Sequence, residues 1–505
     1  MSQPITPTSN ALTIAQQSST GFFSGISQIA TSMKDAIVGT VKKHPTLTKA
    51  TVVLGATLAV GYLAYQYYNS LDKSIDRLVA KAADLPENQC KQEIATFVQQ
   101  NWSKFGLPDF CNNAKNRKFI ETKLDGIIRR HPNQTIELRQ EIAKNAVNNF
   151  CTFISTSLTR VNSDLTGDQD FRALFNIAGQ PNVTGVEILG EETHKKGSNP
   201  LCIAITIEGE QRIVYKPRSV RAEQLVCGAD DSLFHQLELP TYRVYNKAGQ
   251  DYGYCEYLPN LQAENTFNSI EELRDLYVEF GKIEKVARAI GLSDLHYDNI
   301  IMKDGRPHLI DAEVVALPTH QNPYETHLFG QERPGALATT PESKNHIWLG
   351  AEAVAEFGDE AEYVVGLTED LHETGMTGPV LHNSGLTDLI QDLATQEHLA
   401  VVNFDLGDLA EIRAQLGSMN NRIVLVSTEN LSAFIRKDPA TARENFSEAL
   451  TEGLEAWGFQ VDEESWDAVL NKFEEDLKNN DVPLFYHNAE NGEVFYGEYR
   501  IGYSA

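Results

Sequence analysis

The 505-residue chain is long enough for about two to four structural units and for a large hydrophobic core. It carries 43 Lys and Arg residues against 70 Asp and Glu residues, a formal net charge of -27. Such an acidic chain lacks the basic surface that binds phosphate backbones, so we expect no nucleic acid partner. The six cysteines lie far apart, without a CxxC pair. This spacing predicts reduced, structural thiols in a reducing compartment.

The composition and apolar spacing of residues 1–48 predict a disordered arm followed by an amphipathic helix. The first 19 residues are rich in Ser, Thr, Gln and Pro, hold no charged side chain, and have too few apolar groups to order themselves. From Phe22 to Val41 the apolar residues recur mostly at three- and four-residue steps, which is typical of one face of a helix.

The next segment, Ala50 to Leu71, contains no charged residue for 22 positions. A helix of that length can cross a hydrocarbon layer of about 30 Å, and the tyrosines near its far end are typical of a membrane interface. We therefore expect residues 49–71 to form a single transmembrane helix, through which residues 50–71 would attach the protein to a membrane. A buried core helix is the alternative, because Gly55 and Gly61 keep the hydropathy moderate.

Residues 72–175 predict a helical region, because apolar residues recur at three- and four-residue steps in IDRLVAKAADL and again from Ile136 to Leu158. Residues 176–260 change to short β-like runs separated by Gly and Pro, which predicts a strand-rich N-lobe. In the run VYKPRSV, Lys216 ends a strand. A strand lysine in a cleft can bind nucleotide phosphates, although an exposed lysine at a sheet edge is the alternative.

Residues 261–505 are assigned to a C-lobe that begins with a long helix and a hairpin. A capping box, Ser269 to Glu272, starts the helix, and Gly291 ends it. The chain then reads GLSDLHYDNIIMKDGRPHLIDAE. NIIM and PHLI predict two strands joined by the turn KDGR, so polar residues lie at the open end of a β-hairpin.

Phosphoryl transfer explains these polar residues. It needs one carboxylate at the acceptor hydroxyl, an Asn on one metal ion and an Asp on the metal that bridges the phosphates. Asp294, Asn299 and Asp311 fit these parts in order, and the spacing of the first two matches the protein-kinase catalytic loop. The alternative is a solvated hairpin whose Asp and Asn residues only favour turns, but the apolar runs on both sides disfavour it.

Several motifs together resemble the dehydration domain of the class II lanthipeptide synthetases, the LanM type, from about residue 85 to the end of the chain. They are LSDLHYDNIIM with LIDAE, VYKPRSV, LGEETHKKG, YGYCEYLPN and NDVPLF. The resemblance implies an α+β, kinase-like two-lobed fold. It also implies an enzyme that uses ATP and Mg²⁺ to phosphorylate Ser or Thr of a peptide or protein, and then eliminates the phosphate to leave a dehydroamino acid. We expect a stand-alone dehydration domain, without the cyclase.

The resemblance assigns roles residue by residue. For phosphorylation, Lys216 and Arg218 would bind the ATP phosphates. Asp294 and His296 would lie at the acceptor hydroxyl, and Asn299 and Asp311 would bind Mg²⁺. For elimination, the matching residues are Glu192, His194, Arg422 and Thr428. Glu192 replaces an Asp of the family, and the added methylene moves the carboxylate, so elimination is less secure than phosphorylation. Arg422 could instead be an exposed surface residue.

The sequence thus predicts an α+β, kinase-like two-lobed enzyme with a helical N-terminal region and a single transmembrane helix. Its catalytic domain would lie in a reducing, ATP-containing compartment, anchored to a membrane, and a secreted effector is a further hypothesis. Two other function classes stay open. One is a kinase without elimination, acting on a protein or on a lipid or inositol headgroup, and the other is a catalytically inactive scaffold.

Overall fold

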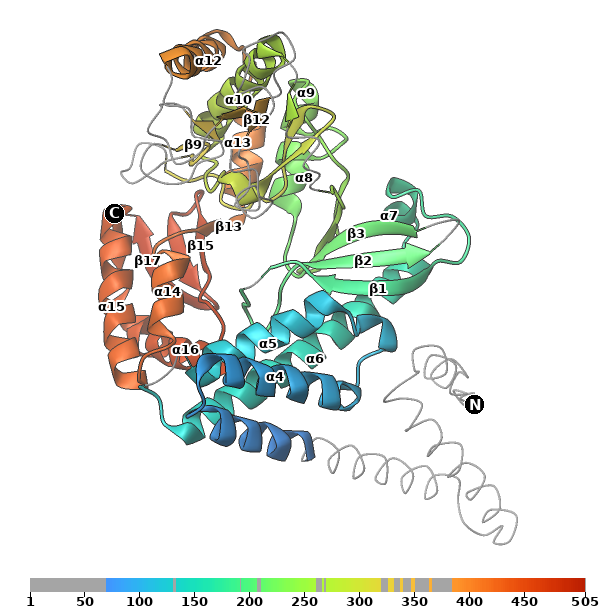
Figure 1. Cartoon of the computed structure of the whole chain (residues 1–505). Helices are drawn as coiled ribbons and strands as arrows, with labels where there is room; N and C mark the ends of the chain where they lie inside the picture. Colours follow the sequence, from blue (N-terminus) through green and yellow to red (C-terminus); the bar gives the residue numbers. More distant parts are fainter. Residues whose placement is uncertain are drawn as a thin grey trace, which may run out of the picture.

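The computed structural model describes residues 70–129, 133–190, 192–206, 210–259, 266–267, 269–318, 326–330, 337–338, 347–349, 363–365 and 384–504. Helices and antiparallel sheets are mixed along this part of the chain (Figure 1). The α+β class expected from the sequence is therefore confirmed. The disordered arm and amphipathic helix expected within residues 1–48 lie outside the described residues.

The expectation of a transmembrane helix is wrong. No helix among the described residues is long and apolar enough to span a bilayer. Residues 50–69 of the expected span lie outside the described part, and Leu71 at its end is 1% exposed and belongs to the hydrophobic core. Leu71 therefore packs against protein, not lipid.

The N-terminal described region is a group of helices. After the helical residues 70–82 come α4 (Glu87–Asn101), α5 (Ala114–Arg129), α6 (Ile136–Gly167) and the short α7 (Gln169–Leu174), with 3₁₀ turns η1 (Trp102–Phe105) and η2 (Asp109–Cys111) after α4. Thr135 caps α6 by accepting a hydrogen bond from the amide of Leu138. The helical region expected from the apolar periodicity is present here.

A five-stranded antiparallel sheet follows and lies against α5 and α6 (Figure 1). Its strands are β1 (Asn182–Ile188), β2 (Leu201–Thr206), β3 (Glu210–Lys216), β4 (Val244–Asn246) and β5 (Gly253–Glu256), in the order β1-β2-β3-β5-β4. The short helices α8 (Arg221–Cys227) and α9 (Leu233–Gln236) connect β3 to β4. Asn116 of α5 fastens the sheet, because its side chain bonds Val186 O at 2.8 Å and the amide of Ile188 at 2.9 Å.

The expected helix and hairpin are both present. Helix α10 (Ile270–Ile290) starts at Ser269, whose hydroxyl accepts from the Glu272 amide at 3.1 Å, and ends at Gly291 with a φ of 66°. A side chain at position 291 would strike Leu317 O at 2.4 Å, so the turn needs glycine. The 3₁₀ turn η4 (Tyr297–Asn299), β7 (Ile300–Lys303) and β8 (Arg306–Leu309) then form the hairpin.

Two small sheets, β10-β9 and β11-β12-β6, and two helices complete this part of the chain. The strands are β6 (Thr266–Phe267), β9 (Phe329–Gly330), β10 (Leu337–Ala338), β11 (Ile347–Leu349) and β12 (Tyr363–Val365). Helix α12 (Ser384–Asn403) packs along α10 so closely that a Cβ at Gly281 would meet Glu397 O at 2.4 Å. Helix α13 (Ala410–Gly417) leads to the last unit.

The C-terminal residues form a second five-stranded antiparallel sheet. Its order is β13-β15-β16-β17-β14, with β13 (Asn420–Ile423), β14 (Phe459–Val461), β15 (Phe485–Asn488), β16 (Glu493–Tyr496) and β17 (Tyr499–Ser504). Helices α14 (Thr428–Phe434), α15 (Pro439–Ala456) and α16 (Trp466–Asn479), with the 3₁₀ turn η5 (Glu463–Ser465), accompany it. The unit bonds to α6, for example from Asn145 Nδ2 to Lys478 O at 2.9 Å. The residues assigned to one C-lobe thus include a separate sheet beside the N-terminal helices (Figure 1).

Two hydrophobic clusters meet at the end of β3. Tyr215 belongs to the cluster of the N-terminal helices and the C-terminal sheet, whereas Val214 belongs to the cluster around α8 and α10. Side chains alternate along a strand, so β3 serves both clusters, one from each face. Val314 and Val315 divide between the same two clusters. The polar residues described next lie at this boundary.

Candidate active site

Lys216, the last residue of β3, is buried, with 6% of its surface exposed. Its ammonium group donates to Ile310 O at 2.6 Å, to Glu223 Oε1 at 2.8 Å and to Asp311 Oδ1 at 3.2 Å. Three donors are all that a lysine has. The structure therefore places Lys216 in the interior, where it joins β3 to the end of the hairpin 95 residues later, and not at a solvated sheet edge.

Glu223 is a site residue that sequence reasoning missed. It lies in the first turn of α8 and is fully buried. Besides Lys216, its Oε1 accepts from Arg218 at 2.5 Å, and its Oε2 accepts from the Cys255 thiol at 3.2 Å. Protein kinases pair their strand lysine with a helix glutamate in this way. The signal was a glutamate seven residues after Lys216, at the start of a short helix.

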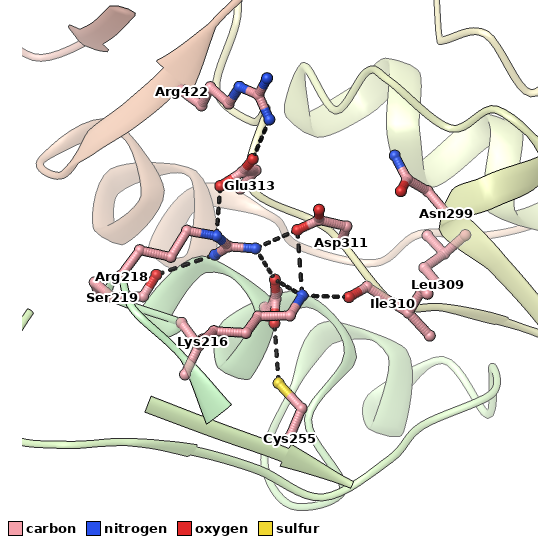
Figure 2. A network of polar contacts seen from close by, with 12 residues as sticks. Lys216, Arg218, Ser219, Cys255, Asn299, Leu309, Ile310, Asp311, Glu313 and Arg422 are labelled. Carbon is pink, nitrogen blue, oxygen red and sulfur yellow. Dashed lines mark hydrogen bonds and ion pairs between the residues drawn. The ribbon is translucent and has the colours of Figure 1, made fainter. Parts of the chain in front are cut away.

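A chain of ion pairs continues from this point through Arg218 to Arg422 (Figure 2). Arg218 contacts Asp311 with one nitrogen and Glu313 with its Nε, at 2.6 Å from Oε2. Glu313 Oε1 in turn contacts Arg422 on β13. Glu313 is therefore a second residue that sequence reasoning missed, although it stands in the motif LIDAE.

The charges in this network stabilise one another. Burial alone would raise the pKa of Asp311, but the Lys216 and Arg218 cations hold it well below its usual value. Burial alone would lower the pKa of Lys216, but Asp311 and Glu223 raise it. The pKa of Arg422 is raised by Glu313 and Asp294 against the effect of its burial. Asp311, Lys216 and Arg422 are thus ionised at neutral pH.

The hairpin mouth holds the three other residues predicted for phosphate transfer. Asn299 Nδ2 donates to Asp294 O at 2.7 Å and lies 3.3 Å from His296 Nε2. Asp294 has a φ of 66°, which is uncommon for a residue with a side chain. The hydrogen bond from the Asn299 side chain to Asp294 O helps to hold this backbone conformation. His296 Nε2 lies 3.7 Å from Asp294 Oδ1. Asp294, His296 and Asn299 therefore form one local group.

Mg²⁺ fits the two residues assigned to it by their chemistry. The Ile310 amide donates to Asn299 O at 3.0 Å, which continues the hairpin ladder and brings Asn299 and Asp311 to the same open end. Together they offer an amide oxygen and a carboxylate, which Mg²⁺ binds with phosphates supplying further ligands. Within the described part of the chain, no group of three His, Cys, Asp or Glu could hold a metal ion.

The residues predicted for elimination lie on three other segments. His194 lies in the β1–β2 loop, Arg422 on β13, and Thr428 begins α14. His194 Nδ1 lies 2.7 Å from Val482 O. Burial, followed by the nearby Arg422 cation, lowers the pKa of His194 to about 4, so the imidazole is neutral at pH 7.

The structure brings several of the predicted residues into direct contact, such as Lys216, Arg218 and Asp311. The Glu192 carboxylate Oε1 accepts from the Ser432 hydroxyl of α14 at 3.3 Å. Arg422 links the two groups of residues, because it bonds Glu313 and acts electrostatically on both His194 and Asp294. It is half-buried and ion-paired, and so differs from the exposed surface arginine considered as the alternative.

The buried network around Lys216, the hairpin mouth and the loop that holds His194 are the three parts of the candidate site. Residues 138–339 of the chain match a family model described as a domain of unknown function, DUF4135. A stretch of 182 residues is 25% identical to the lacticin 481/lactococcin biosynthesis protein LcnDR2 of Lactococcus lactis subsp. lactis. That stretch is 34% of this chain and spans 18% of the length of the relative. Both findings support the resemblance to LanM-type lanthipeptide synthetases.

Proposed function

We propose that this chain is an ATP- and Mg²⁺-dependent enzyme that phosphorylates Ser or Thr hydroxyls of a peptide and then eliminates the phosphate. The observation that carries the proposal is the bonding of Lys216 to both Glu223 and Asp311, at 2.8 and 3.2 Å. A buried strand lysine, a helix glutamate and an aspartate after a hairpin are the parts that kinases use to bind ATP phosphates. The similarity to a lacticin biosynthesis protein supports a peptide as the substrate.

In the first step, the substrate hydroxyl oxygen attacks the γ-phosphorus, and the bond from that phosphorus to the bridging oxygen of ADP breaks. Asp294 takes the hydroxyl proton, and Lys216 binds the phosphates as a point charge. Asn299 and Asp311 would hold Mg²⁺, which supplies charge neutralisation on the phosphate oxygens. Arg218 contacts Asp311 in this structure and would lie beside the same phosphates.

In the second step, a base removes the proton from the α-carbon, the electron pair forms the double bond, and the Cβ–O bond breaks to release phosphate. We assign His194 as the base. A carbonyl oxygen only accepts hydrogen bonds, so His194 Nδ1 must carry the proton that it donates to Val482 O. Nε2 therefore holds the lone pair that can accept a proton. A phosphate paired with Arg422 would cancel part of the charge that lowers the pKa of His194, and would make it a stronger base.

Intact-mass analysis tests the proposal. The full chain is incubated with ATP, Mg²⁺ and a library of synthetic peptides that each contain one Ser or Thr. Phosphorylation adds about 80 Da to a peptide, whereas phosphorylation followed by elimination removes about 18 Da from it. The proposal fails if neither mass change occurs with any peptide while ATP raises the melting temperature of the protein, because ATP binding alone would show an intact nucleotide site.

A kinase without elimination is the second candidate, and the contact of Glu192 with Ser432 favours it. The carboxylate that the family places beside the histidine here bonds to α14. If elimination needs that carboxylate, the reaction would stop at the phosphorylated peptide. The same mass measurement separates the two candidates, because this one predicts the gain of about 80 Da without the loss.

A further inference from the structure

The loop that holds His194 has an unusual backbone. Between β1 and β2, His194 and Ser198 exchange amide hydrogen bonds at 3.1 and 2.7 Å. The three residues at the tip, Lys195, Lys196 and Gly197, all have positive φ values, of 43°, 65° and 81°. Two of them carry side chains, which disfavour this conformation. Contacts from elsewhere must therefore hold the loop.

Asp481 supplies these contacts. It follows α16, 284 residues after Gly197, and is fully buried. Its Oδ2 accepts from the Lys196 amide at 2.5 Å, and its Oδ1 accepts from the Gly197 amide at 3.1 Å. Successive amides in this backbone conformation point into one concave space that suits an anion. Burial raises the pKa of Asp481 to about 6, which leaves it ionised at pH 7.

The residues on both sides of Asp481 complete a clamp on the loop. The Val482 amide donates to Thr193 O at 2.8 Å, and the Thr193 hydroxyl donates to Asn480 O at 3.2 Å. Val482 O also accepts the Nδ1 proton of His194 at 2.7 Å. One short segment, residues 480–482, therefore holds the loop backbone and selects the tautomer of the imidazole.

We infer that Asp481 is a positioning residue for His194. Its carboxylate holds the Lys196 and Gly197 amides, which keeps the loop against residue 482. His194 Nδ1–H then keeps donating to Val482 O, and the lone pair stays on Nε2. The catalytic consequence rests on the proposed function, since it concerns elimination and not phosphate transfer. The arrangement of the ring does not depend on that function.

The first experiment reads the tautomer directly. The full chain is labelled with ¹⁵N-histidine, and two-bond proton–nitrogen spectra are recorded at pH 7.5, with the His194 signals assigned by their loss in His194→Ala. We expect a single neutral form with the proton on Nδ1 in the wild type. In Asp481→Asn, whose amide nitrogen would face the donating amides, we expect loss of this single form and a mixture of both tautomers. An unchanged His194 spectrum in Asp481→Asn would overturn the inference.

Two further variants control this result. Asp476→Asn removes a charge from another buried aspartate, on α16, whose side chain contacts Lys472 and Tyr496; its His194 spectrum should stay wild-type. Gly197→Ala strains the loop from the other side, because its φ is 81° and a Cβ would lie 3.0 Å from Asn149 Cβ. It should also give a tautomer mixture, and it carries the test if Asp481→Asn does not fold. A single wild-type tautomer in Gly197→Ala would then overturn the inference.

The second experiment measures the two products with the same peptide library. We expect Asp481→Asn to lower the dehydrated fraction about 10-fold or more, with phosphorylated peptide accumulating, while Asp476→Asn retains both products. Equal loss of both products in Asp481→Asn would contradict a positioning role. If the wild type makes no product, the proposed function fails, and the tautomer spectra alone decide the inference.

Discussion

The network around Lys216 and the loop around His194 differ in how their charges are compensated. In the network, three carboxylates and three cations contact one another, from Lys216 through Asp311 and Glu313 to Arg422. In the loop, His194 is neutral and held by backbone carbonyl and amide groups. The network comes from β3, α8, the hairpin and β13, whereas the loop depends on one C-terminal segment, residues 480–482.

This difference separates the two proposed steps. A dense set of opposite charges can bind ATP phosphates by exchanging partners, so Lys216, Glu223 and Asp311 should affect phosphate transfer. A neutral imidazole on a clamped loop can accept a proton without carrying a charge of its own. Changes at Lys216, Glu223 or Asp311 should therefore stop the reaction at its start. Changes around the loop, or at Arg422, which links the loop to the network, should stop it after phosphorylation.

The largest effect is expected for the two Mg²⁺ ligands. Asp311→Asn and Asn299→Ala should each lower phosphate transfer to the peptide library about 1,000-fold, because a metal ligand is lost from the charged transition state. ATP turnover and peptide mass give the rates. Circular dichroism should show an intact fold.

Asp304→Asn is the matched control, because Asp304 lies in the turn at the opposite end of the same hairpin. It should keep wild-type activity. Near-normal turnover in either ligand variant would show that the metal assignment is wrong.

Glu223→Gln should come next, with about 100-fold slower phosphate transfer. It should also lose about 3 kcal/mol of stability, because Lys216 and Arg218 keep their buried charges after one carboxylate is removed. Urea titration measures the free energy of unfolding. Glu256→Gln, which breaks a half-buried pair between Arg243 and Glu256 outside the network, should cost about 1 kcal/mol or less. Equal losses in the two variants would mean that Glu223 has no special role.

Glu223 also shows where prediction from the sequence ends. Asp294, Asn299 and Asp311 were predictable because the helix, turn and hairpin that bring them together are local, and each has a clear signal in the chain. The contacts of Glu223, Glu313 and Asp481 depend on how distant segments pack, and no periodicity reports that. Composition also could not predict the environment of Leu71. An apolar side chain suits lipid and a protein core equally, so hydropathy alone does not distinguish the two.

Arg422→Lys should separate the two steps. Lysine keeps the charge but cannot bond phosphate through two parallel donors, so we expect dehydration to fall about 100-fold while the phosphorylated peptide accumulates. His194→Ala and Thr428→Ala should do the same, whereas Asp294→Ala should give no product at all. Intact-mass analysis distinguishes these outcomes. Wild-type behaviour of Arg422→Lys would remove Arg422 from the elimination site.

The smallest effect is a difference in acid stability between the two regions. The unfolded histidine takes up a proton near pH 6.5, but the pKa of His194 in the folded chain is about 4. Between these values only the unfolded state gains the proton, so the loop region loses stability as the pH falls from 6.5 towards 4. The pKa values of Asp311 and Glu313 are lowered, so their contribution is present above the usual carboxyl pKa values of about 4 and is lost as the pH falls through these values and below them.

The measurement is the change in unfolding free energy between pH 7 and pH 4.5, compared in the wild type and His194→Gln. The variant should lose about 2 kcal/mol less than the wild type over this interval, because glutamine takes up no proton. Asp481 acts in the opposite direction, since its raised pKa of about 6 lets the folded state take up a proton first, but this term is present in both proteins and cancels in the difference. In Glu313→Gln the corresponding change should appear only below about pH 5. A loss that is equal in the wild type and His194→Gln would mean that His194 is more accessible to protons than its contacts with Val482 and Arg422 imply.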